Sequence, residues 1–154
     1  DTRCIHQKCF GIFYFYDKIN LESDKMDCLF CKIIEGSIPS KTIYEDDIVK
    51  VFLDINPNTN GHCLVIPKKH IVTIDEADDE LINHIFKVIK EMHKILKEKL
   101  NIEGLTICQN NNLGQEVKHL HFHLIPRYKV DNWKLEFNQE DLKDIDEIYN
   151  IITK

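Results

Sequence analysis

The chain has 154 residues, of which 43% are hydrophobic, so it is long enough for one globular domain with a buried core. Its formal net charge of -6 argues against a general nucleic-acid surface, which usually carries a basic patch. No run of the sequence approaches the roughly 18 apolar residues of a membrane span. We therefore expect neither a nucleic acid nor a membrane as a partner.

The N-terminal part of the chain combines an irregular extension with a cysteine pair. Residues 1–25 hold an aromatic cluster but no amphipathic period, and we expect an extension that is disordered or non-native, ahead of one domain over residues 26–154. Cys28 and Cys31 form a C-x-x-C pair, which inside a cell is more often a metal or redox site than a disulfide. We expect reduced thiols and a cytoplasmic or nuclear protein.

Hydrophobic patterning and turn residues predict eight elements after the extension. They are a helix at 29–35, strands at 43–44, 48–53 and 62–67, a long helix from about 81 to 100, strands at 105–108 and 119–126, and a C-terminal amphipathic helix over 142–152 with Asn138 as its cap. This order lacks regular βαβ alternation, so the predicted fold class is α+β with a five-stranded antiparallel sheet.

The long helix has the clearest pattern of these elements. Its apolar residues recur at helical spacing, at Leu81, Ile85, Ile89, Met92 and Leu96. Acidic residues at 76–80 precede this stripe and basic residues at 97 and 99 close it, which matches the helix dipole. We expect Gly104 to end the segment.

The stretch from His119 to Pro126 alternates polar and apolar side chains, as a half-buried strand does. Successive side chains of a strand point to opposite faces, so His119, His121 and His123 are expected to share one face. Two chemistries fit such a face. A His-x-His pair can bind a catalytic zinc ion with a third ligand from elsewhere. Imidazole can also serve as a nucleophile or an acid–base group near neutral pH.

Four other runs accompany the histidine strand, at residues 28–34, 54–57, 61–70 and 114–115. Together they resemble the histidine triad family of nucleotide-binding hydrolases and transferases, over about residues 27–128. The combination is most similar to the branch of nucleoside phosphoramidases and small bacterial-type triad proteins. This resemblance implies an antiparallel sheet with a long helix and a homodimer.

The resemblance also implies a catalytic role for three histidines. His121 corresponds to the family's nucleophile, which attacks the α-phosphate and forms a covalent nucleotidyl intermediate that water resolves. His123 corresponds to the residue that contacts the phosphate oxygens or the leaving group, and a histidine here favours hydrolysis over nucleotide transfer. His62 corresponds to a histidine that positions the nucleophile through hydrogen bonds.

The nucleotide itself is implied to bind through a second set of residues. Asp54 corresponds to the carboxylate that accepts the ribose hydroxyls, and Asn110 and Gln115 correspond to polar phosphate contacts. The base is expected between Leu29, Phe30, Ile33, Phe52 and Ile55. Glu116 adds a carboxylate beside the expected phosphate, which costs binding energy unless it points away or pairs with Lys118.

Some triad proteins hold a structural zinc ion, and the resemblance implies the ligands Cys28, Cys31, His70 and His119. Two thiolates and two imidazoles close a tetrahedral site and leave no open position for catalysis. We therefore expect structural zinc and no catalytic metal.

The resulting hypothesis is an adenosine 5′-monophosphoramidase-type hydrolase that acts on purine nucleoside phosphoramidates. Three alternatives stay open. They are a dinucleoside polyphosphate hydrolase of the same family, a zinc-dependent hydrolase, and a non-catalytic nucleotide-binding regulatory dimer in which Glu116 prevents turnover.

Overall fold

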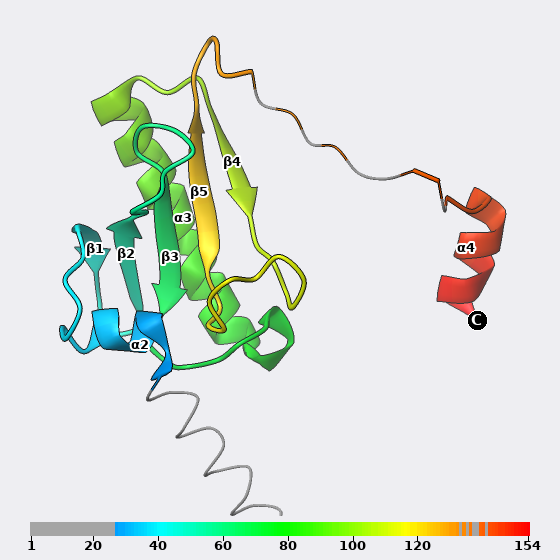
Figure 1. Cartoon of the computed structure of the whole chain (residues 1–154), viewed down its shortest axis with the longest axis horizontal. Coiled ribbons are helices and arrows are strands. Elements are labelled where there is room, and N and C mark those ends of the chain that lie inside the picture. Colours follow the sequence, from blue (N-terminus) through cyan, green and yellow to red (C-terminus); the bar gives the residue numbers. More distant parts are fainter. Residues whose placement is uncertain (1–26, 133, 135, 137–138, 141) are drawn as a thin grey trace, which may run out of the picture.

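The computed structural model describes residues 27–154 except 133, 135, 137, 138 and 141. The expected extension at 1–25 and the expected cap Asn138 lie outside these residues. The elements are α2 (Leu29–Ile34), β1 (Thr42–Glu45), β2 (Val49–Leu53), β3 (Cys63–Pro67), the short 3-10 helix η1 (Ile74–Glu76), α3 (Asp79–Leu100), β4 (Gly104–Cys108), β5 (Phe122–Arg127) and α4 (Ile145–Thr153). The five strands form one antiparallel sheet in the order β1-β2-β3-β5-β4 (Figure 1). The predicted α+β class is confirmed.

Helix α3 covers one face of the sheet (Figure 1). It begins where the Asp78 carboxylate accepts the backbone N–H of Leu81, a standard N-cap contact. It ends at Leu100, because Asn101 adopts the left-handed conformation with a φ of 53°. The prediction that Gly104 ends the helical segment is therefore wrong, since Gly104 already begins β4.

Side-chain alternation along the strands gives the sheet two buried faces. On the α3 face the buried side chains include Val51, Val65 and Leu124 together with the predicted apolar stripe of α3. On the opposite face α2 packs Phe30 and Ile33 against Phe52, Leu64 and Ile66. The candidate site lies on this α2 face.

The histidine segment is only partly a strand. β5 begins at Phe122, and its pairing with β3 reaches no further than Val65 opposite Phe122, so the strand predicted from residue 119 is too long. Upstream of it, the Leu120 N–H donates to the carbonyl of Ile71, which lies outside the sheet. His119 and His121 nevertheless face α2, with ring centroids 5.9 and 5.2 Å from that of Phe30.

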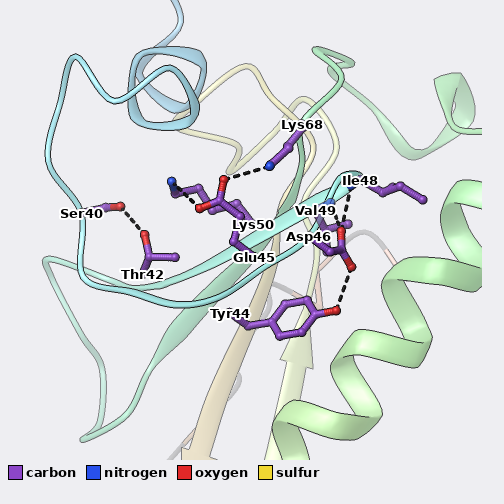
Figure 2. Close-up of polar contacts among 9 residues, drawn as sticks. All are labelled: Ser40, Thr42, Tyr44, Glu45, Asp46, Ile48, Val49, Lys50 and Lys68. Carbon is purple, nitrogen blue, oxygen red and sulfur yellow. Dashed lines mark hydrogen bonds and ion pairs between the residues drawn. The ribbon is translucent and has the colours of Figure 1, made fainter.

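The turn between β1 and β2 is held by the carboxylate of Asp46 (Figure 2). It accepts hydrogen bonds from the backbone N–H groups of Ile48 and Val49 and from the hydroxyl of Tyr44, each at 2.8 Å. His84 of α3 donates through Nε2 at 2.7 Å, which ties the turn to the helix. Burial opposes ionisation of Asp46, but these hydrogen bonds prevail and lower its pKa.

Helix α4 lies apart from the sheet and from α3 (Figure 1). It begins after Asp144, whose carboxylate accepts the N–H of Asp146, so the predicted start at residue 142 is too early. None of its nine residues is buried. Within the part of the chain that the structure describes, no helix is both long and apolar enough to cross a membrane.

Candidate active site

The loop between β2 and β3 brings Asp54 and His62 to the start of β5. The N–H of Asp54 donates to the carbonyl of His62, which closes the loop at 3.0 Å. His62 Nε2 then lies 3.0 Å from Nδ1 of His123 and 3.6 Å from Oδ2 of Asp54. The ring of His121 stands beside that of His123, with centroids 5.0 Å apart. The structure therefore gathers the predicted ribose carboxylate and the three predicted catalytic histidines at one point.

The hydrogen bonds of His121 define which ring nitrogen is available for attack. Its Nδ1 lies 2.6 Å from the carbonyl oxygen of His119, and a carbonyl only accepts. Nδ1 therefore carries the proton, and Nε2 of the neutral ring keeps a lone pair. This tautomer is the one that a nitrogen nucleophile requires.

Hydrogen bonds also determine which ring nitrogens of His62 and His123 carry a proton. The N–H of Asn58 donates to Nδ1 of His62 at 3.1 Å, so His62 carries its proton on Nε2. That proton is donated to Nδ1 of His123, which leaves the His123 proton on Nε2. His62 thus orients His123, whereas the sequence predicted that it would orient the nucleophile.

The same tautomers bear on metal binding at this point. Asp54, His62 and His123 are close enough to share an ion. However, the Asn58 contact leaves Nε2 of His62 protonated, without a lone pair for a metal. The hydrogen-bond pattern therefore fits an organic acid–base site better than a catalytic metal site.

Burial keeps the three histidines neutral near pH 7. It lowers the pKa of His62 and of His121, and with the nearby imidazoles it lowers the pKa of His123 to about 4. The carboxylate of Asp54 acts in the opposite direction on all three pKa values but does not outweigh burial. A neutral imidazole is the form that can attack phosphorus.

The residues expected around the base fall into two groups. Phe30, Ile33 and Phe52 are buried in the core between α2 and the sheet. Leu29 and Ile55 are exposed, at 43% and 91%. The two exposed side chains are the ones with surface left for a ligand.

Gln115 is buried, and the protein itself uses its amide. Its Nε2 donates to the carbonyls of Val72 and His119, and its Oε1 accepts the N–H of Asn112. Because the His119 carbonyl also receives the His121 proton, Gln115 supports the backbone that orients His121. Asn110 is only partly buried, and its amide nitrogen donates to the carbonyl of Gly114.

Glu116 follows Gln115 and is exposed. The ammonium group of Lys118 donates to the carbonyl of Asn112 at 3.2 Å rather than to the Glu116 carboxylate. The Glu116 carboxylate acts through space to raise the pKa of His121, against the larger effect of burial.

The four predicted zinc ligands meet beside this site. Their ligand atoms all lie within 4.8 Å of one another, although they come from three distant segments. Nδ1 of His119 lies 3.5 and 3.7 Å from the sulfurs of Cys28 and Cys31, and Nδ1 of His70 lies 3.2 Å from that of Cys31. A tetrahedral zinc ion would separate sulfur from nitrogen by about 3.6 Å. The donor set and its spacing therefore fit zinc.

The tautomer of His119 agrees with this role. Its Nε2 donates to the carbonyl of Pro67 at 2.8 Å, so Nδ1 has a lone pair that faces the two cysteines. Three backbone groups, of Asn58, Pro67 and His119, thus set the protonation of this face. These contacts could not be predicted from the sequence, because every residue has a backbone carbonyl and the residue type does not indicate where it points.

Comparison with known proteins identifies the family of this arrangement. A family model described as HIT domain matches residues 35–130. An uncharacterized HIT-like protein of Methanocaldococcus jannaschii is 51% identical over 79% of this chain and 95% of its own length. A Candida albicans protein named adenosine 5′-monophosphoramidase is 42% identical over 65% of this chain and 70% of its own length. The crystal structure of a zinc-bound histidine triad protein from Mycobacterium smegmatis superposes with a TM-score of 0.68 at 34% identity, over 75% of this chain and 86% of that one.

Proposed function

This chain belongs to the HIT domain family, and we propose that it hydrolyses purine nucleoside phosphoramidates through a covalent nucleotidyl intermediate on His121. The observation that carries the proposal is the 2.6 Å contact from His121 Nδ1 to the His119 carbonyl, which leaves Nε2 as a free nucleophile. The names of relatives such as the Candida albicans adenosine 5′-monophosphoramidase support the substrate class.

The reaction has two displacements at phosphorus. In the first, the lone pair of His121 Nε2 forms a bond to the α-phosphorus while the bond from phosphorus to the leaving nitrogen breaks. The leaving amine takes its electron pair together with the proton from Nε2 of His123. In the second, water attacks the same phosphorus and returns a proton to Nε2 of His123, the bond to His121 Nε2 breaks, and the nucleoside monophosphate departs. Dividing one difficult displacement in this way suits a neutral nitrogen nucleophile near pH 7.

His123 would serve both steps through its Nε2 proton. Since Nδ1 of His123 already accepts the proton of His62, Nε2–H is free to donate to a phosphate oxygen or to the leaving nitrogen. The partly buried carboxylate of Asp54 would accept hydrogen bonds from the ribose hydroxyls. Leu29 and Ile55 would flank the base, and the Gln115 amide would keep the backbone around His121 in place.

We propose zinc as a structural ion held by Cys28, Cys31, His70 and His119. When bound, it would join the start of α2 to the segments after β3 and before β5. His119 would then stand next to the catalytic residues without a share in the chemistry, because a closed Cys₂His₂ site has no open position. Both thiols must be reduced for this role, which suits a reducing compartment.

The proposal is tested by AMP release. The purified chain is incubated with adenosine 5′-monophosphoramidate and with diadenosine polyphosphates, with and without a chelator. Release from the phosphoramidate that the chelator leaves unchanged in the first minutes supports the proposal. Release only from the polyphosphates would favour a dinucleoside polyphosphate hydrolase. Release from neither, with AMP still bound, would favour a nucleotide-binding module and would make Glu116→Gln the next variant to assay.

A further inference from the structure

Helix α4 has an apolar face that none of the residues described in the structure covers. Ile145, Ile148, Tyr149 and Ile152 lie at helical spacing on one side, and their exposed fractions run from 38% to 80%. Helices shorter than about 12 residues are marginal in water unless packing supports them. With nine residues, α4 needs a partner surface for this face.

An apolar groove of matching character lies between α3 and the edge of the sheet. It encloses about 300 Å³ and is lined by Ile43, Leu53, Gly61, Met92, Ile95, Leu96, Lys99 and Leu100. Ile43, Leu53, Ile95 and Leu100 are each about 40% exposed, so their side chains offer a continuous apolar surface. Gly61 forms part of the wall, and a Cβ there would stand only 2.4 Å from Leu100, so the groove depends on this glycine.

The charges at the two surfaces are complementary. At the start of α4, Glu147 is paired with Lys143, while Asp144 and Asp146 leave a net negative charge. At the end of α3, which borders the groove, Lys99 is paired with Glu98, while Lys97 leaves a net positive charge. A helix that approaches the groove with its acidic start toward this end of α3 gains attraction as well as apolar burial.

We propose that α4 of one copy of this chain docks in the α3 groove of a second copy. In the structure α4 lies apart from its own sheet and from α3 (Figure 1). No residue of α4 lines the groove of its own chain. Reciprocal exchange between two copies covers both helices and both grooves, and it gives the self-complementary interface of a two-fold dimer. The inference goes beyond the proposed activity and does not depend on it.

Photo-crosslinking with mixed isotopes tests the exchange. The photoreactive residue p-benzoylphenylalanine replaces Tyr149 in the full chain, and ¹⁴N and ¹⁵N preparations are unfolded and refolded together before illumination. Crosslinks that join residue 149 of one isotope to groove peptides of the other are expected. Crosslinks to the groove of the same isotope only, crosslinks to residues 1–26, or no crosslink at all would each overturn the proposal.

Sedimentation equilibrium of two variants adds a quantitative test. Ile148→Asp in α4 and Ile95→Asp in the groove are each expected to weaken dimerisation by roughly tenfold or more, since each places a charge in the apolar contact. Leu113→Asp is the matched control, because this side chain is 94% exposed and belongs neither to the groove lining nor to α4. Circular dichroism confirms that each variant is folded. Equal dissociation constants for all three variants and the wild type would contradict the docking.

Discussion

Replacing Asp46 by Ala is expected to lower the free energy of unfolding by about 2–4 kcal/mol. The carboxylate accepts two hydrogen bonds from the turn backbone and one from Tyr44 (Figure 2). It accepts a fourth from His84. Each such bond contributes about 0.5–1.5 kcal/mol net, and the lower part of that range applies because the side chain is 25% exposed. The sum gives the expected loss.

Two further variants make the test of this anchor specific. Asp46→Asn keeps the oxygen that accepts from the N–H groups of Ile48 and Val49, but its amide nitrogen accepts from neither Tyr44 nor His84. Two of the four hydrogen bonds are lost, so about half the loss is expected. Asp47→Ala changes the neighbouring exposed carboxylate of the same turn and should stay within about 0.5 kcal/mol of the wild type. Urea unfolding followed by circular dichroism measures all three.

The stabilising effect of Asp46 depends on pH in a defined direction. Hydrogen bonds lower its pKa in the folded chain, against burial, whereas the unfolded chain has the ordinary value of about 3.9. The contribution is therefore complete above about pH 5 and is lost as the pH falls below it, with a slope that approaches about 1.4 kcal/mol for each pH unit well below pH 4. The difference between wild type and Asp46→Ala should shrink between pH 5 and pH 3. A difference that stays constant over this range, or a loss no larger than that of Asp47→Ala, would show that the Asp46 carboxylate does not stabilise the turn.

Three other outcomes are expected. Gly61→Ala should lower the free energy of unfolding by about 1–3 kcal/mol, because the new Cβ would lie 2.4 Å from Leu100 and the backbone φ is 83°. An unchanged midpoint of urea unfolding would contradict this packing. Elemental analysis should find zinc in the wild type, and Cys31→Ala should remove this zinc and lower the Tm. A wild type that contains no metal, and whose Tm is the same with and without a chelator, would exclude the zinc proposal. His123→Ala should slow AMP release by about 10²–10⁴ with less than a tenfold change in AMP affinity, and a wild-type rate would remove His123 from the chemistry.

Local patterns in the sequence were sufficient for most of the fold. The apolar period from Leu81 to Leu96 predicted α3, and the alternation around Phe122 and Leu124 predicted the inward face of β5. The errors lay at the ends of helices and strands, where the backbone conformation of a single residue decides where the element stops. Asn101 ends α3 by adopting a left-handed conformation, which glycine favours but asparagine also tolerates.

The site was predictable in its residue types but not in its hydrogen bonds. The histidines at every second position and the C-x-x-C pair were sufficient to predict a functional site. The structure places His70 and His119 beside Cys28 and Cys31, as the family resemblance implied. The contact of His62 with His123, and that of Asp46 with His84, link residues 61 and 38 positions apart. Such contacts depend on how loops close on the sheet, which no local pattern encodes.

During turnover, Nε2 of His121 is expected to become bonded to the α-phosphorus of the nucleotide. The direct measurement is mass spectrometry of the chain after rapid alkaline quenching in the presence of adenosine 5′-monophosphoramidate, with His121→Ala as the control. We expect a peptide that contains His121 and carries one adenylyl group, and we expect the variant to lose both the adduct and AMP release. Steady AMP release by His121→Ala, or an adduct on His123 instead, would contradict this expectation.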